Sequence, residues 1–147
     1  MTPGHADSLE IRSDISELER IFAFIDPYCE RSGIPDAIKY KLFLVAEELT
    51  MNAIGHGYDG RSDGRILIAL RRITPDVELY FEDEAPAFDV LRDAREPDLD
   101  ADVAERRIGG LGIHLLKALS RSATYSYEGG RNIVRVRFGE EAAEASK

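Results

Sequence analysis

The segment from Glu47 to Gly60, EELTMNAIGHGYDG, places polar side chains at regular intervals on an otherwise apolar helix pattern. Glu48, Asn52 and His56 follow one another four residues apart. Because residues four apart lie on neighbouring turns of one side of a helix, the spacing predicts a short polar column. Burying such groups costs free energy unless they are hydrogen-bonded or bind a ligand, so the column is a candidate functional site.

A carboxylate and an amide one helical turn apart suit phosphoryl transfer. Mg²⁺ prefers oxygen ligands and is commonly shared with phosphate oxygens and waters, which makes Asn52 a candidate metal ligand. Glu48 is then a candidate base that orients or deprotonates an attacking hydroxyl. The alternative is a solvated helix end that is capped at Gly55 and Gly57.

Two expected strands each carry a polar side chain in phase with their apolar side chains. Asp83 continues the alternation of the strand 76–83, and Asn132 shares the parity of the apolar residues in the strand 131–138. A polar group aimed at the core is costly without a partner. Asp83 either caps a turn or lines a pocket and accepts a hydrogen bond from a ligand amino group, such as that of adenine. Asn132 is either a turn residue or flanks a planar ligand.

A glycine-rich turn, IGGLGIHLL, precedes the last expected helix. Its three glycines in four positions let the backbone approach a ligand and present N–H groups at a helix N-terminus, where phosphates bind. No GK[ST] follows, so the turn is not a P-loop. The preceding segment 85–107 is rich in Pro, Asp and Arg and lacks periodicity, which is typical of a binding loop or of a disordered surface segment.

The composition limits the class of protein. The chain has 147 residues with 44% hydrophobic residues, which suits one globular domain. Its 28 acidic and 19 basic residues give a net charge of −9, which argues against direct nucleic-acid binding. The single cysteine, Cys29, excludes an intramolecular disulfide and is expected to be a buried or half-buried helix residue. We find no targeting segment and no membrane span, and we expect a cytoplasmic protein.

The order of elements predicts an α+β two-layer sandwich, with helices packed on one face of a mixed, mainly antiparallel sheet. The expected elements are a strand at 8–13, helices at 14–33 and 36–55, strands at 65–73 and 76–83, a helix at 108–120, and a hairpin at 121–130 and 131–138.

Four segments, EELTMNAIGHGY, FEDEAPAFD, GGLGIHLL and GGRNIVRVRF, resemble in order and spacing the N, G1 and G2 boxes of the GHKL (Bergerat) ATP-binding fold. With a stand-alone short chain and HGY after the N box, the sequence is similar to the anti-sigma-factor serine/threonine kinases of bacterial partner-switching systems. The resemblance runs from Leu9 to Phe138. It implies a single histidine-kinase-like ATPase domain over 1–147, with flexible ends at about 1–7 and 140–147 and an ATP lid at about 89–109.

The resemblance also implies roles for individual residues and two cofactors, ATP and Mg²⁺. Glu48 becomes the catalytic base, Asn52 the magnesium ligand, and Asp83 the acceptor for the adenine amino group. The remaining nucleotide-binding positions are Ala85, Gly110, Leu111, Gly112 and Asn132.

The implied activity is phosphorylation of a STAS-type antagonist by a kinase that also binds a sigma factor or another regulatory target, and the resemblance suggests a homodimer. One departure concerns the G1 box, which is usually D-x-G-x-G but here reads D-E-A-P-A, with Ala85 and Ala87 in place of glycines. This departure favours an alternative, a nucleotide-gated protein-binding regulator without phosphoryl transfer.

Overall fold

The computed structural model describes residues 7–93 and 116–139. The two chain ends expected to be flexible lie outside these ranges, apart from Asp7, which begins the first strand. Most of the expected lid and the glycine turn that contains Gly110, Leu111 and Gly112 also lie outside the described residues. Within the described ranges, no helix is both long enough and apolar enough to span a bilayer.

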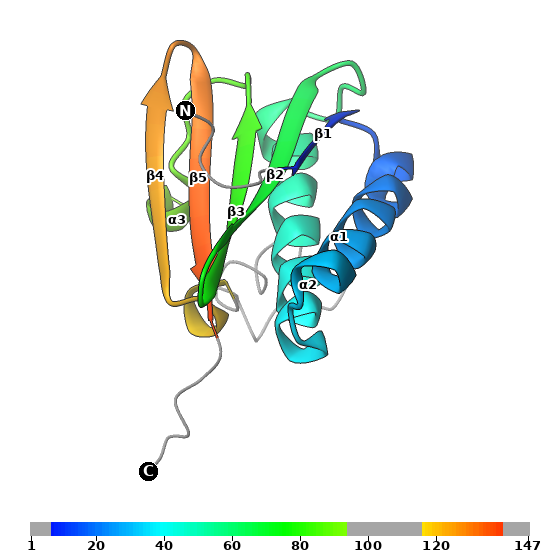
Figure 1. The fold of residues 1–147 in the computed structure, drawn as a ribbon. Coiled ribbons are helices and arrows are strands. Elements are labelled where there is room, and N and C mark those ends of the chain that lie inside the picture. The colour runs from blue at the N-terminus through cyan, green and yellow to red at the C-terminus, as the bar shows by residue number, and fades with distance from the viewer. Residues whose placement is uncertain (1–6, 94–115, 140–147) are drawn as a thin grey trace, which may run out of the picture.

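The described strands form one five-stranded sheet in the order β1-β2-β3-β5-β4 (Figure 1). All four neighbouring pairs are antiparallel. The helices α1 and α2 lie side by side on one face of this sheet (Figure 1), so the predicted α+β two-layer architecture is confirmed. The strands are β1 (Asp7–Arg12), β2 (Arg65–Ile73), β3 (Asp76–Asp83), β4 (Ser122–Glu128) and β5 (Arg131–Phe138).

The helix α1 (Leu18–Ser32) packs through one side. Its buried residues, Ile21, Ile25, Tyr28 and Cys29, recur at helical spacing, and Cys29 is 1% exposed, as expected for a buried helix residue. A short 3-10 turn (Ile15–Glu17) precedes the helix and begins at Asp14, which accepts a hydrogen bond from the Ser16 amide at 2.9 Å. Gly33, at φ 68°, ends the helix in the left-handed conformation.

The second helix, α2 (Asp36–Asn52), is buried over much of its circumference, because it packs against both α1 and the strands β3 and β5. Its regular geometry stops at Asn52, and a π-helical turn (Ala53–Gly57) follows where an ordinary helix was expected to reach residue 55. A further short helix, α3 (Val90–Asp93), occupies the start of the expected lid.

The core lies between the helices and the sheet. Alternate residues of the central strands point into it, and Asp83 and Asn132 share that side, as their parity predicted. The fully buried strand residues include Ile66, Ile68, Leu70, Val77, Leu79, Val136 and Phe138.

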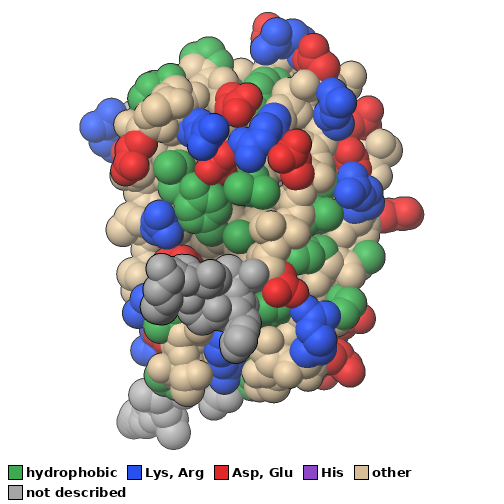
Figure 2. Space-filling model, turned by 45° about the horizontal axis from the view of Figure 1, so that its top comes forward, with side chains coloured by type: hydrophobic (Ala, Val, Ile, Leu, Met, Phe, Trp, Pro, Cys, Tyr) green, Lys and Arg blue, Asp and Glu red, His purple; other side chains and the backbone are tan. Residues whose placement is uncertain are grey.

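The opposite face of the sheet carries a network of charged side chains. Glu82 is 4% exposed and accepts hydrogen bonds from Arg65 and from the Tyr80 hydroxyl, each at 2.6 Å. Burial alone would raise the pKa of Glu82, but these two hydrogen bonds and the charges of Arg65 and Arg131 together outweigh it, and the pKa lies below its usual range. The Arg135 guanidinium lies 4.9 Å from the centre of the Tyr80 ring. On the face that Figure 2 presents, positive and negative side chains lie around a group of hydrophobic ones.

Candidate functional site

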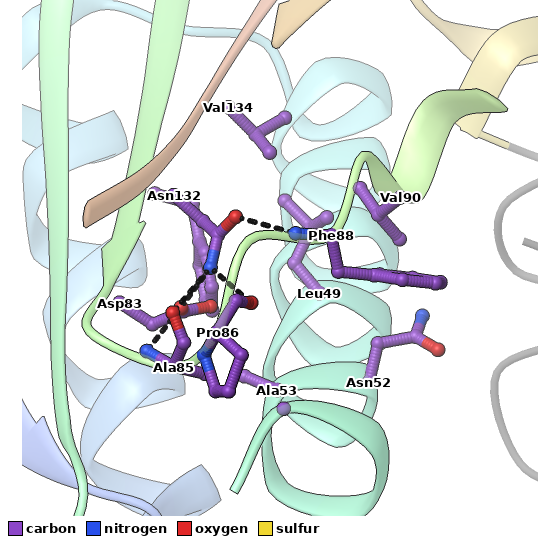
Figure 3. Close-up of a pocket in the computed structure, with 12 residues that line it drawn as sticks. Leu49, Asn52, Ala53, Asp83, Ala85, Pro86, Phe88, Val90, Asn132 and Val134 are labelled. Atoms are coloured by element: carbon purple, nitrogen blue, oxygen red, sulfur yellow. Dashed lines mark hydrogen bonds between the residues drawn. The ribbon is translucent and has the colours of Figure 1, made fainter. Parts of the chain in front are cut away.

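A pocket lies where the end of α2, the end of β3 and the start of β5 meet. Leu49 and Asn52 line it from α2, Asp83 from β3, and Asn132 from β5. The segment after β3 contributes Ala85, Pro86 and Phe88, and Figure 3 shows the Phe88 ring reaching toward the side on which Asn52 lies. The site therefore unites three regions that are distant in the sequence.

The predicted pair on α2 is formed. The Asn52 side chain donates from Nδ2 to Glu48 Oε2 at 2.9 Å and to the Glu48 carbonyl at 3.0 Å. Glu48 is 9% exposed and Asn52 is 8% exposed, so the alternative of a solvated helix end is wrong. Within the described residues, Asn52 Oδ1 has no hydrogen-bond partner, and this oxygen is the atom that a metal ion would bind.

The environment of Glu48 favours its protonated form. Burial raises the pKa of its carboxyl from 4.5 to about 7, the Asn52 hydrogen bond acts in the opposite direction, and the nearby charge of Glu47 adds to the increase. A carboxylate with a pKa near neutrality can both accept and release a proton at physiological pH, which is the property required of a general base.

His56 does not continue the polar column. The π-helical turn begins at Ala53 and changes the direction in which the following side chains point. His56 is exposed, and its ring is stacked near that of Phe88, with centroids 6.3 Å apart and an angle of 23° between the planes. The predicted column of three therefore becomes a buried pair followed by an aromatic contact at the edge of the pocket.

Asp83 both caps the turn after β3 and lies in the pocket lining. Its Oδ1 accepts a hydrogen bond from the Ala85 amide at 3.0 Å, which caps the turn after β3, and another from Asn132 Nδ2 at 2.9 Å. Asp83 also lines the pocket and is 7% exposed. No described residue hydrogen-bonds its Oδ2, which leaves that oxygen for a donor on a ligand. Burial raises the pKa of this carboxyl, while Asn132 and Ala85 counteract the increase.

Asn132 lies within β5 opposite Asp83, so the alternative of a turn residue is wrong. Besides Asp83, its Nδ2 donates to the carbonyls of Ala85 at 3.0 Å and Pro86 at 3.1 Å. Its Oδ1 accepts hydrogen bonds from the Phe88 amide at 2.9 Å and from the Tyr125 hydroxyl (Figure 3 shows the bond to Phe88). Protein groups therefore engage both ends of this amide, which suits a residue that positions the pocket.

The departure at Ala85 and Ala87 does not strain the backbone. Among the described non-glycine residues, Asp59 alone has a positive φ, so neither alanine needs the conformational freedom of glycine. Ala85 is 2% exposed and packs beside Gly57, whereas Ala87 is exposed. The two alanines are therefore compatible with a formed pocket.

Tyr58 lies beside the pocket, and the sequence analysis noted it only as the last residue of the HGY motif, without a role. Its hydroxyl donates to the Arg65 carbonyl at 2.6 Å and accepts from the Glu84 amide at 2.7 Å, so it ties the start of β2 to the end of β3. The available signal was an aromatic residue placed directly after the helix end, among glycines and polar residues.

The donor set suits a magnesium ion that is shared with phosphates. No group of three or more His, Cys, Asp or Glu side chains in the described part of the chain could hold a metal by itself. Mg²⁺ is commonly bound through one or two protein oxygens together with phosphate oxygens and waters, and Asn52 Oδ1 offers one such oxygen. Asn52 therefore fits this type of site.

Comparison with known proteins agrees with this geometry. A family model described as a histidine kinase-like ATPase domain matches residues 11–138. The serine-protein kinase RsbW of Listeria monocytogenes serovar 1/2a is 28% identical over 106 residues, which cover 70% of this chain and 67% of the relative. The serine/threonine-protein kinase BtrW of Bordetella bronchiseptica is 22% identical over 126 residues, covering 86% of this chain and 88% of the relative.

Among solved structures, the histidine kinase AdeS of Acinetobacter baumannii matches with a TM-score of 0.46 and 20% identity. The match covers 69% of this chain and 46% of that chain, so the present chain spans less than half of the histidine kinase's length.

The raised pKa of Glu48 predicts a pH-dependent effect on stability. The folded state binds the Glu48 proton more tightly than the unfolded state does. The stabilisation of the folded state by this proton is therefore complete below about pH 4.5 and is lost as the pH rises through about 7. We expect Glu48→Gln to raise the free energy of unfolding at pH 8 by about 1–3 kcal/mol and to have little effect at pH 5. Urea unfolding at both pH values measures this, with Glu30→Gln, at an exposed position on α1, as the control. An equal effect at both pH values would contradict the assigned environment.

Proposed function

This chain belongs to the histidine kinase-like ATPase domain family, and we propose that it transfers the γ-phosphate of ATP to a serine or threonine hydroxyl of a partner protein. The observation that carries the proposal is the buried Glu48–Asn52 pair beside a pocket that contains the unpaired oxygen of Asp83. Two relatives in different bacteria that are named as serine or serine/threonine protein kinases support the choice of acceptor.

The nucleotide would lie across the pocket between Asp83 and Asn52. Asp83 Oδ2 would accept a hydrogen bond from the adenine amino group, and Asn52 Oδ1 would contribute a ligand to Mg²⁺. Bound Mg²⁺ would neutralise charge on the phosphate oxygens. Asn132 and Ala85 would shape the base-binding end of the pocket, while Gly110, Leu111 and Gly112 would bind the phosphates through their backbone.

Glu48 would act on the acceptor hydroxyl. Its carboxylate would orient the hydroxyl and take its proton as the oxygen forms a bond to the γ-phosphorus. The bond from that phosphorus to the bridging oxygen of ADP would break in the same transfer, and ADP would leave with the electron pair. Hydrogen bonding from Asn52 would hold the Glu48 carboxylate in place during this step.

The proposed partner is a STAS-type antagonist that carries the acceptor hydroxyl, with a sigma factor or another regulatory protein as the second target. These partners and a homodimer are what the resemblance to the anti-sigma-factor kinases implies, and a cytoplasmic location is proposed with them. The names of the relatives support the kinase activity but do not name the partners.

A nucleotide-gated binding protein without phosphoryl transfer is the second candidate function. Ala85 and Ala87 at the positions of two glycines favour it. Since both alanines have ordinary backbone conformations and Glu48 is buried next to Asn52, we place the kinase first.

The assignment of Asp83 predicts a loss of base recognition in Asp83→Asn. The variant removes a charged acceptor from the pocket, and we expect ATP affinity to fall by about tenfold or more, with a reduced preference for ATP over GTP. Competition against a fluorescent ADP analogue measures both quantities. Glu84→Gln, which alters the exposed neighbouring carboxylate, should bind ATP like the parent. Unchanged ATP affinity in Asp83→Asn would refute the adenine assignment.

Glu48→Gln should separate binding from catalysis. The substitution keeps the size and much of the hydrogen bonding of the side chain, so nucleotide affinity should stay within a few-fold of the parent. Phosphoryl transfer should fall by on the order of 10²–10⁴, the usual contribution of a positioned base. Radiolabelled ATP and the cognate antagonist measure transfer, and Glu47→Gln is the control.

Equal transfer by Glu48→Gln and the parent would remove Glu48 from the mechanism. If the parent binds ATP but transfers nothing to its true partner, the binding-protein function is favoured instead.

A further inference from the structure

Three consecutive residues, at the end of the π-helical turn and directly after it, contact the segment that follows β3. The Tyr58 hydroxyl accepts the Glu84 amide hydrogen bond, Gly57 packs on Ala85, and the His56 ring is stacked near the Phe88 ring. The contacted residue moves from 84 to 88 as the tripeptide is followed backwards from residue 58 to residue 56. This is the order of contacts expected of two antiparallel segments. The tripeptide His56–Gly57–Tyr58 therefore contacts the segment 84–88 near both of its ends.

Gly57 and Ala85 form the closest of these contacts. A Cβ atom added at Gly57 would lie 2.9 Å from the Ala85 Cβ, closer than real Cβ contacts. Gly57 does not have a positive φ, so its backbone conformation does not require glycine. The absent side chain instead provides room for the Ala85 methyl. Gly55, in the same π-helical turn, has no such neighbour within 4 Å of an added Cβ.

Tyr58 fixes the same segment through its hydroxyl. Its two hydrogen bonds join the Arg65 carbonyl to the Glu84 amide, and its ring is 4% exposed. Gly64 packs against this ring so closely that a Cβ there would lie 2.5 Å from the ring carbons. The position of Tyr58 is thus set by close packing as well as by hydrogen bonds.

The segment 84–88 is held from its other side by Asn132, which bonds the backbone of Ala85, Pro86 and Phe88. The residue that precedes the segment is Asp83, the proposed base-binding residue. Asn52, the proposed metal ligand, lies four residues before His56. The contacts of the tripeptide therefore link the two ends of the proposed nucleotide site through short, packed stretches of chain.

We propose that His56–Gly57–Tyr58 is a positioning element that sets the separation between Asp83 and Asn52, with Gly57 and Ala85 as its complementary pair. This inference rests on the proposed nucleotide-binding function. A ligand that spans both ends gains affinity when the two ends are held at the right separation, whereas a ligand that reaches one end gains little. Ala85, which departs from the usual glycine, is then accommodated by Gly57.

A double-mutant cycle tests the pair. The variants are Gly57→Ala, Ala85→Gly and the double variant, and the ligands are ADP with Mg²⁺, which spans the site, and adenosine, which reaches the base end. Competition against a fluorescent ADP analogue gives each affinity. Gly57→Ala should weaken ADP by about tenfold or more, because overpacking displaces the segment, and should weaken adenosine less. The double variant, in which Ala85→Gly removes the opposing methyl, should regain most of the ADP affinity that Gly57→Ala alone loses.

Gly55→Ala is the matched control, because it adds the same methyl in open space two residues away. Its affinities for both ligands should equal those of the parent. If Gly57→Ala does not fold, Tyr58→Phe provides the same comparison, since it removes the hydroxyl that links Glu84 to Arg65 and should also weaken ADP more than adenosine.

Additive effects in the cycle, or equal losses for ADP and adenosine, would overturn the positioning role while leaving the proposed function intact. A parent protein that binds neither ligand would overturn the proposed function and the positioning role together.

Discussion

Asp83 and Asn132 face each other on the core side of the sheet, and the arrangement of the pocket depends on the hydrogen bond between them. Each side chain is less than 8% exposed, so each would be costly to bury without a partner. The Asn132 amide also binds the backbone of the segment after β3, which turns back across the pocket as a result. One buried polar pair thereby stabilises the end of β3, shapes the pocket wall and leaves Asp83 Oδ2 for a ligand.

The helix end supplies the second half of the site under a related constraint. Glu48 and Asn52 are buried together, and their hydrogen bond offsets part of the cost of desolvating the carboxylate. The π-helical turn that follows directs His56, Gly57 and Tyr58 toward the segment after β3. The proposed chemistry therefore depends on two buried polar pairs, one on a helix and one on the sheet, which the tripeptide joins.

Sequence periodicity predicted most of the fold, because the burial of alternate strand residues and of one side of α1 leaves a clear pattern. The strands β2, β3 and β5 have the predicted bounds. The pattern could not predict the π-helical turn, where Gly57 packs against Ala85, because periodicity along one segment does not contain a contact with a distant one. For the same reason, the four-residue spacing wrongly predicted that His56 belongs to the polar column. The alternation of side chains along the strands correctly placed Asp83 and Asn132 on the core side of the sheet. It could not predict the partners of Asn132, because they lie in a segment 44 to 47 residues away in the chain.

The central claim is that one pocket holds a nucleotide with its base at Asp83 and its metal-bound phosphates at Asn52. A crystal structure of the protein with ADP and Mg²⁺ tests it most directly. We predict that the adenine amino group lies within hydrogen-bond distance of Asp83 Oδ2 and that Asn52 Oδ1 is a ligand of the metal. An ADP molecule bound with its base away from Asp83, or a metal ion that Asn52 does not contact, would contradict the account.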